Sequence, residues 1–274
     1  MRTVLTIAGF DPSSGAGITA DLMVFAAHGL FGTSCITALT VQSTLGVKSV
    51  RAVPAEVVRE TLACLQEDIP PAGIKIGMLA TSDNVRVVCE YLETLRRSPQ
   101  GSSIPVVLDP VIQSSSGMRL LDEPGVYLLR ERLLVLVDWV TPNVPELAAL
   151  TGRKVRGPEG VPEACGVLQQ RAGGRLGVFA TGGHLERPDD YLLEAGAHGT
   201  WMRGERVKTK STHGTGCALS SAFLSRLVLG DAAGSAARLA KDYVEGALRT
   251  AEPIGNGSGP MNHLWPIVKV SDAT

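Results

Sequence analysis

The chain has 274 residues, of which 44% are hydrophobic and 19% charged, and its formal net charge is −1. This composition is typical of a folded α/β enzyme, and it excludes a disordered chain. The basic residues are scattered, so we expect no nucleic-acid partner. No apolar stretch approaches the roughly 20 residues of a membrane span, and the N-terminal apolar run is too short for a secretory signal.

Five cysteines are spread along the chain without a CxxC pair. Their odd number and their spacing are typical of unpaired thiols in a reducing compartment, so we expect a cytoplasmic protein. The length is at the upper limit of what one hydrophobic core supports, and no linker-like stretch interrupts the chain. We therefore expect a single domain over residues 1–274.

Apolar runs typical of buried strands alternate with segments of helical period along most of the chain. Strands are predicted at 3–8, 34–41, 74–77, 106–108, 139–141 and 176–180. Helices are predicted at 18–26, 54–65, 84–95 (capped by Ser82), 124–134, 145–150, 218–229 and 232–250. This alternation predicts an α/β fold with a central, mainly parallel β-sheet and helices on both faces.

Polar or glycine-rich loops directly follow several of the predicted strands. They cover residues 9–17, 42–46, 77–80, 109–117, 141–146 and 182–184. Ligands of open α/β sheets bind outside the carboxyl ends of the strands. We therefore expect these loops to converge on one site.

Residues 15–20, Gly-Ala-Gly-Ile-Thr-Ala, match the G-x-G-x-x-A pattern of dinucleotide-binding proteins. That pattern requires its first glycine in the tight turn directly after the strand, whereas here a longer loop intervenes. The acidic residue expected about twenty positions later is also missing. We therefore reject a dinucleotide site, and the absence of a G-x-x-x-x-G-K-[ST] motif excludes a P-loop.

A stronger pattern is Thr-His-Gly-Thr-Gly-Cys at 212–217, followed by a predicted helix. Two glycines allow backbone amides to approach a ligand closely, and free amides at a helix start form an anion site suited to a transferred phosphoryl group. The alternative is an ordinary glycine-rich turn with a buried cysteine. At the helix start, Cys217 is expected to have a lowered pKa. Whether it acts as a base or positions a hydroxyl stays open at this point.

Two carboxylates, Asp109 and Glu146, follow predicted strands. Mg²⁺ in a kinase site takes one or two carboxylates together with water and phosphate oxygens, and these two residues suit that need. Asn143 is placed to reach water or phosphate. The alternative for each acid by itself is a helix cap or a solvated loop carboxylate.

The stretch Ile7 to Asp21, IAGFDPSSGAGITAD, resembles the opening signature of the hydroxymethylpyrimidine/phosphomethylpyrimidine kinases of thiamin biosynthesis, which have the ribokinase-like fold. The similarity continues in the family's order through residues 37–47, 75–79, 108–111, 141–146, 182–184, 213–217 and 257–260. It thus covers nearly the whole chain.

The resemblance implies a role for individual positions. Residues matching the pyrimidine site are Gly9, Ala16, Asp21, Gln42, Met78 and Val111. Those matching the anion hole and its cysteine are Gly214, Thr215, Gly216 and Cys217, and the magnesium-linked acids match Asp109 and Glu146. Nucleotide contacts are expected from Asn143, Thr181, Lys210, Thr212 and Lys241. Thr181 stands where the family generally has a lysine, and Lys208 or Lys210 is a candidate to compensate.

The implied reaction is ATP- and Mg²⁺-dependent phosphorylation of 4-amino-5-hydroxymethyl-2-methylpyrimidine, and then of its monophosphate to the diphosphate. The family commonly forms homodimers, so we expect one here. One alternative is pyridoxal kinase activity, because related enzymes accept a hydroxymethylpyridine. Another is a non-catalytic protein that binds a nucleotide or a pyrimidine.

Overall fold

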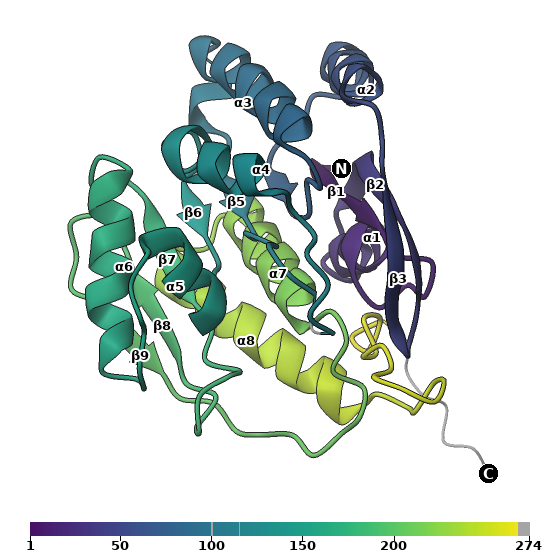
Figure 1. The fold of residues 1–274 in the computed structure, drawn as a ribbon, viewed down its shortest axis with the longest axis vertical. Helices are drawn as coiled ribbons and strands as arrows, with labels where there is room; N and C mark the ends of the chain where they lie inside the picture. Colours follow the sequence, from purple (N-terminus) through teal and green to yellow (C-terminus); the bar gives the residue numbers. More distant parts are fainter. Residues whose placement is uncertain (100, 115, 268–274) are drawn as a thin grey trace.

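The computed structural model of the chain describes residues 1–99, 101–114 and 116–267. The end of the predicted domain, residues 268–274, lies outside these ranges. In the described part, all strands join in one sheet of order β3-β2-β1-β4-β5-β6-β7-β8-β9, covered by helices (Figure 1). None of the described helices combines the length and apolarity that a membrane span requires.

The elements follow the alternation that the sequence predicts. The strands are β1 Thr3–Phe10, β2 Phe31–Ser43, β3 Gly46–Ala52, β4 Ile74–Ile76, β5 Val106–Leu108, β6 Trp139–Val140, β7 Gly177–Ala180, β8 Asp190–Leu193 and β9 Thr200–Met202. The α-helices are α1 Gly17–Ala27, α2 Ala55–Asp68, α3 Ser82–Arg97, α4 Glu123–Leu128, α5 Val144–Thr151, α6 Gly160–Arg171, α7 Thr215–Leu229 and α8 Ala233–Arg249. A short 3₁₀-helix, η1 Gly101–Ser103, and a short π-helix, η2 Leu129–Leu133, complete them.

The middle of the sheet is parallel and its margins are antiparallel. Strands β2, β1, β4, β5, β6 and β7 run parallel, whereas β3, β8 and β9 pair antiparallel with their neighbours. Every residue of β1 except its first and last is buried, as expected of a parallel strand covered on both faces. The predicted mainly parallel sheet is confirmed.

Two hydrophobic cores lie on opposite faces of the sheet. On one face α2, α3, α5 and α6 pack against the strands, in a core that includes Leu92, Leu147 and Ile76. On the other face α1, α7 and α8 form the second core around Phe25 and Phe223 (Figure 1). Because both faces of the central strands are covered, ligands reach these strands only at their ends.

Some elements escaped the prediction. Strand β3 begins at Gly46, where a loop is expected, because Gln42 of β2 pairs with Val47 in an antiparallel hairpin. Strands β8 and β9 and helix α6 were also not predicted. The N-cap of α3 is not Ser82 but Thr81, whose Oγ1 accepts a hydrogen bond of 3.3 Å from the Asn84 amide.

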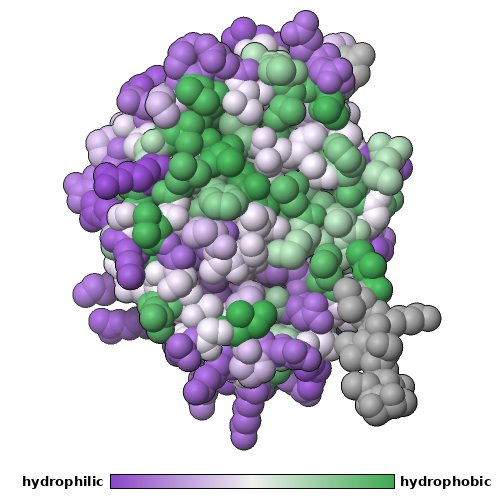
Figure 2. Space-filling view, turned by 90° about the vertical axis from the view of Figure 1, so that its right-hand side faces the viewer, coloured by the Kyte–Doolittle hydropathy of each residue, from purple (hydrophilic) through white to green (hydrophobic). Residues whose placement is uncertain are grey.

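The hairpin of β2 and β3 forms one edge of the sheet. Figure 2 shows this side of the molecule, where apolar side chains gather. Leu39, Val41 and Leu45 of the hairpin region are exposed, as is Val57 of α2. Exposed apolar side chains gathered on one face are typical of interaction surfaces.

The order of the strands reverses at β1. The chain passes from β1 to β2 on one side, and later enters β4 on the other side of β1. In open α/β sheets such a reversal leaves a crevice outside the carboxyl ends of the strands, where ligands bind. The residues that follow β1, β2 and β4 are therefore placed to form a site.

Candidate active site

A cavity of about 520 Å³ lies at the carboxyl ends of the parallel strands. It is lined by residues from each of the loops that were predicted to converge. Among them are Gly9, Gln42, Met78, Asp109 and His184. Residues 213–217 complete its wall. The predicted convergence of the loops is confirmed.

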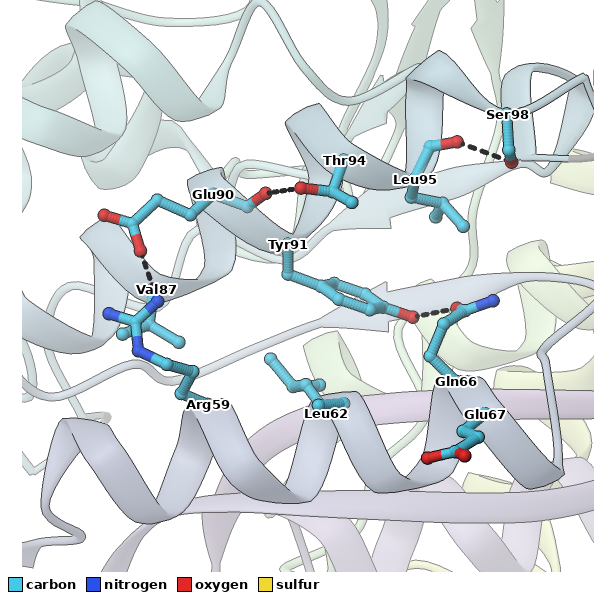
Figure 3. Close-up of a pocket in the computed structure, with 11 residues that line it drawn as sticks. Arg59, Leu62, Gln66, Glu67, Val87, Glu90, Tyr91, Thr94, Leu95 and Ser98 are labelled. Atoms are coloured by element: carbon cyan, nitrogen blue, oxygen red, sulfur yellow. Dashed lines mark hydrogen bonds and ion pairs between the residues drawn. The ribbon is translucent and has the colours of Figure 1, made fainter.

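A second cavity, of about 460 Å³, lies between α2 and α3. Its polar side chains largely engage one another: Arg59 pairs with Glu90, and the Tyr91 hydroxyl donates to Gln66 Oε1 over 2.8 Å (Figure 3). This groove is remote from the loops that follow the parallel strands. The chemistry therefore belongs to the first cavity.

The first turn of α7 presents free backbone amides to that cavity. Its N-cap Gly214 has φ 82° and ψ 15°. None of the hydrogen bonds among the described residues is donated by the amides of Gly214, Thr215, Gly216 or Cys217. These amides and the helix dipole together favour an anion.

The anion site and the predicted ring site are joined by one side chain. Gln42 Nε2 lies 2.8 Å from His213 Nε2, and the same nitrogen lies 2.7 Å from Asp11 Oδ2. His213 directly precedes Gly214, so the amide of Gln42 lies close to the amides of α7. No site role is predicted from the sequence for His213 or Asp11, although both lie within the motifs at 7–21 and 212–217.

A buried ion pair lies next to the cavity. Lys75 Nζ lies 3.0 and 2.9 Å from the two carboxylate oxygens of Asp21, and both side chains are fully buried. Thr6 and Ser221 donate hydroxyl hydrogen bonds to the same carboxylate. Burial acts to lower the pKa of Lys75, but the charge and the hydrogen bond of Asp21, with a further contribution from Asp109, outweigh it and raise that pKa. The lysine is therefore charged.

Asp21 does not lie where the resemblance implies. Expected at the substrate ring, it is absent from the described residues that line the cavity. Its oxygens are engaged by Lys75, Thr6 and Ser221. Lys75, by contrast, lines the cavity. A lysine within an apolar strand signals a paired buried charge, and this signal in residues 74–77 could have identified it.

Asp109 and Glu146 are both buried beside the anion site. Burial, together with the neighbouring Asp109, raises the pKa of Glu146 to about 8. Burial also raises the pKa of Asp109, although Lys75 opposes this shift. Two buried carboxyl groups that repel each other fit a divalent cation, which would relieve both shifts.

The set of donors suits Mg²⁺ better than a metal that needs an all-protein cage. Among the described residues, no cluster of three or more His, Cys, Asp or Glu side chains is arranged to bind a metal ion. Mg²⁺ keeps several waters and shares phosphate oxygens, so two carboxylates are sufficient. Glu146 also accepts a hydrogen bond of 2.9 Å from the Asn143 amide in a capping box that begins α5.

The expected low pKa of Cys217 is wrong. Burial raises the pKa of this thiol to about 12, with Asp109 and Asp21 adding to the effect and Lys75 opposing it. The helix start does not compensate for the loss of solvent and the nearby acids. The thiol is therefore neutral near pH 7, and its Sγ accepts a hydrogen bond from the Gly17 amide while it donates to Asp109.

The predicted nucleotide contacts divide into two groups. Asn143 and Thr181 line the cavity, whereas Lys210, Thr212 and Lys241 are absent from its described lining. Lys241 is paired with Asp190 and donates to the carbonyl of Pro188. Thr212 contacts Ser258, and Lys210 is exposed. Lys75 is the only lysine among the described lining residues, and no arginine joins it.

The fold and the site together define the class of the protein, which is a small-molecule kinase of the ribokinase-like fold. A solved structure of phosphomethylpyrimidine kinase from Clostridium difficile superposes with a TM-score of 0.78 at 34% identity, covering 90% of this chain and 100% of that one. Pyridoxal kinase from Bacillus subtilis, solved as an ADP complex, gives a TM-score of 0.84 at 27% identity over 96% and 97% of the two chains.

Residues 11–262 match the family model described as phosphomethylpyrimidine kinase, and the chain belongs to this family. The hydroxymethylpyrimidine/phosphomethylpyrimidine kinase of Haemophilus influenzae is 38% identical over 96% of this chain and 97% of its own length. The thiamine biosynthesis bifunctional protein ThiED of Geobacter sulfurreducens is 39% identical over 98% of this chain. The chain spans 54% of that longer relative.

Proposed function

We propose that the chain transfers the γ-phosphoryl group of ATP to the hydroxymethyl group of 4-amino-5-hydroxymethyl-2-methylpyrimidine, and then phosphorylates the monophosphate to the diphosphate, as a step of thiamin biosynthesis. The observation that carries this proposal is the contact between Gln42 and His213, since it joins the ring-binding amide to the amides of α7 within one cavity. The names of the relatives support the same substrate.

Each part of the cavity has a task in this reaction. The Gln42 carboxamide binds the ring, and Met78 and Val111 contribute apolar walls. The amides of residues 214–217 receive the charge of the transferred group. Asp109 and Glu146 would hold Mg²⁺, which when bound neutralises phosphate charge. Asn143, which caps α5 and lines the same cavity, would contact a phosphate.

To decide the function, purified protein with ATP and Mg²⁺ is offered the pyrimidine, its monophosphate and pyridoxal, and the products are identified by mass spectrometry. We expect pyrimidine mono- and diphosphate with a higher kcat/KM than for pyridoxal. Preference for pyridoxal would favour the alternative that the Bacillus neighbour suggests. If no ADP is released with any of these acceptors, the kinase proposal is contradicted and a binding protein is favoured.

Cys217 is better placed to position the acceptor hydroxyl than to act as a free base, because its thiol is neutral near pH 7. We expect Cys217→Ala to lower kcat by more than about tenfold, with little change in the KM for ATP. Cys217→Ser, which keeps a small hydrogen-bonding group, should retain more of kcat than the alanine variant. Steady-state kinetics measure both, and near-wild-type turnover of Cys217→Ala would remove Cys217 from the mechanism.

Thr181 leaves the nucleotide side of the cavity short of positive charge, because Lys208 and Lys210 are exposed and do not line it. We expect Thr181→Lys to lower the KM for ATP by about tenfold, the usual gain from one hydrogen bond to a charged group. Thr181→Met adds comparable length without charge and should give no gain. An unchanged or higher KM for ATP in Thr181→Lys would show that other groups already compensate.

We further propose that residues 1–274 form one cytoplasmic domain that associates as a homodimer. The single sheet supports one domain. The resemblance to dimeric kinases and the exposed Leu39 and Val41 of the β2–β3 hairpin support association of two copies. Light scattering after size-exclusion chromatography measures the mass, and a monomer at micromolar concentration would contradict the homodimer.

A further inference from the structure

One ring nitrogen of His213 contacts two partners, of which one accepts a hydrogen bond and the other is drawn as a donor. Its Nε2 lies 2.7 Å from an oxygen of Asp11 and 2.8 Å from the carboxamide of Gln42. A ring nitrogen carries either a proton or a lone pair, so it cannot donate to Asp11 and accept from Gln42 at the same time. The state of Asp11 therefore decides how Gln42 is oriented.

Asp11 is surrounded by donors. Its side chain is nearly buried, and it accepts hydrogen bonds from the Ser13 amide over 2.8 Å, the Ser13 hydroxyl over 2.7 Å and the Ala16 amide over 3.0 Å. Burial acts to raise the pKa of Asp11, but the hydrogen bonds from His213 and Ser13 outweigh it and lower that pKa. Asp11 is thus ionised near pH 7, and the proton of its contact with His213 belongs to Nε2.

An Nε2–H group requires an acceptor from Gln42. Rotation of the carboxamide about its last bond exchanges its carbonyl and amino ends with little change of shape. The contact with His213 is attractive only when the carbonyl oxygen faces the imidazole. The amino group is then free to donate to a ligand, and the second lone pair of the oxygen can still accept.

We propose that His213, fixed by Asp11, is a positioning residue that orients the Gln42 carboxamide. The oriented amide matches a ring edge in which an unprotonated nitrogen stands beside an amino group, because the nitrogen accepts and the amino group donates. The identity of this ring as an aminopyrimidine rests on the proposed function, whereas the orientation of Gln42 does not.

The fit around the imidazole supports a fixed position. A Cβ added at Gly15 would lie 2.2 Å from His213 Cδ2, so the glycine leaves room for the ring. The carbonyl of Gly15 lies 3.2 Å from Nε2 of the buried His263, which holds this loop in place. The imidazole is therefore confined between the first loop and the start of α7.

The first test needs no substrate. The wild-type protein and the His213→Gln variant are labelled with ¹⁵N-histidine and compared by NMR. Of the signals of the five histidines, the one that is missing in the variant belongs to His213. We expect the His213 Nε2 to be protonated near neutral pH. An unprotonated Nε2 would overturn the proposal, whatever the substrate of the enzyme is.

The second test is a double-mutant cycle in the kinase assay. His213→Asn removes the group that corresponds to Nε2, and it should raise the KM for the pyrimidine by about tenfold. The kcat and the KM for ATP should stay within about twofold of the wild-type values. In the Gln42→Ala background the same substitution should change the KM for the pyrimidine less than about twofold. His213→Gln, which returns N–H donors at this distance, should recover most of the loss, and exposed His198→Asn is the control. Equal losses in both backgrounds would overturn the proposal.

Discussion

Gly214→Ala is expected to lower kcat by about a hundredfold or more. Gly214 has a positive φ of 82°, which an alanine adopts only with strain, and an added Cβ would lie 1.8 Å from the carbonyl oxygen of Gly15. Relief of this clash has to move the first turn of α7 or the Gly15 loop. The amides of residues 214–217 would then no longer point toward the transferred phosphate. Loss of a single such donor typically lowers kcat 10²- to 10³-fold.

Gly230→Ala is a matched control for this substitution. Gly230 caps the other end of α7 with φ 105°, and an added Cβ meets no described neighbour within 4 Å. It should therefore carry a comparable backbone strain and lower the melting temperature without changing kcat. Similar kcat values for Gly214→Ala and the wild type, at saturating substrates, would show that the amides of α7 do not stabilise the transition state.

Lys75→Met should lower the free energy of unfolding by about 3–5 kcal/mol. The substitution preserves much of the side-chain volume but leaves the carboxylate of Asp21 fully buried without its counter-charge. Thr6 and Ser221 still donate to that carboxylate, and these hydrogen bonds offset only part of the lost charge. Urea unfolding followed by circular dichroism measures the change.

Two further variants separate the charge effect from other causes. Lys75→Met combined with Asp21→Asn should be more stable than Lys75→Met alone, since no unpaired charge remains buried. Lys48→Met, on the exposed side of β3, should change the free energy of unfolding by less than about 0.5 kcal/mol. A double variant as unstable as the sum of the two single variants would refute an ionic origin.

Local pattern was sufficient for the central strands and for the convergence of their loops. The apolar runs at 3–8, 74–77 and 106–108 lie in the predicted parallel sheet, since a strand covered on both faces needs apolar residues throughout. Parallel strands end at the same edge, so their loops had to meet. Short edge strands such as β9 were missed because few residues carry their pattern.

By itself, therefore, the sequence determined the fold class, the motifs of the family and the edge of the sheet where the site lies. The tertiary structure alone decided which motif residues reach the cavity. Asp21 and Lys241 do not line it, because Asp21 forms a buried ion pair with Lys75 and Lys241 forms an ion pair with Asp190. The tertiary structure also raised the pKa of Cys217 and brought Asp11 to His213. These outcomes depend on burial and on charges far apart in the sequence, and both arise only when the chain packs.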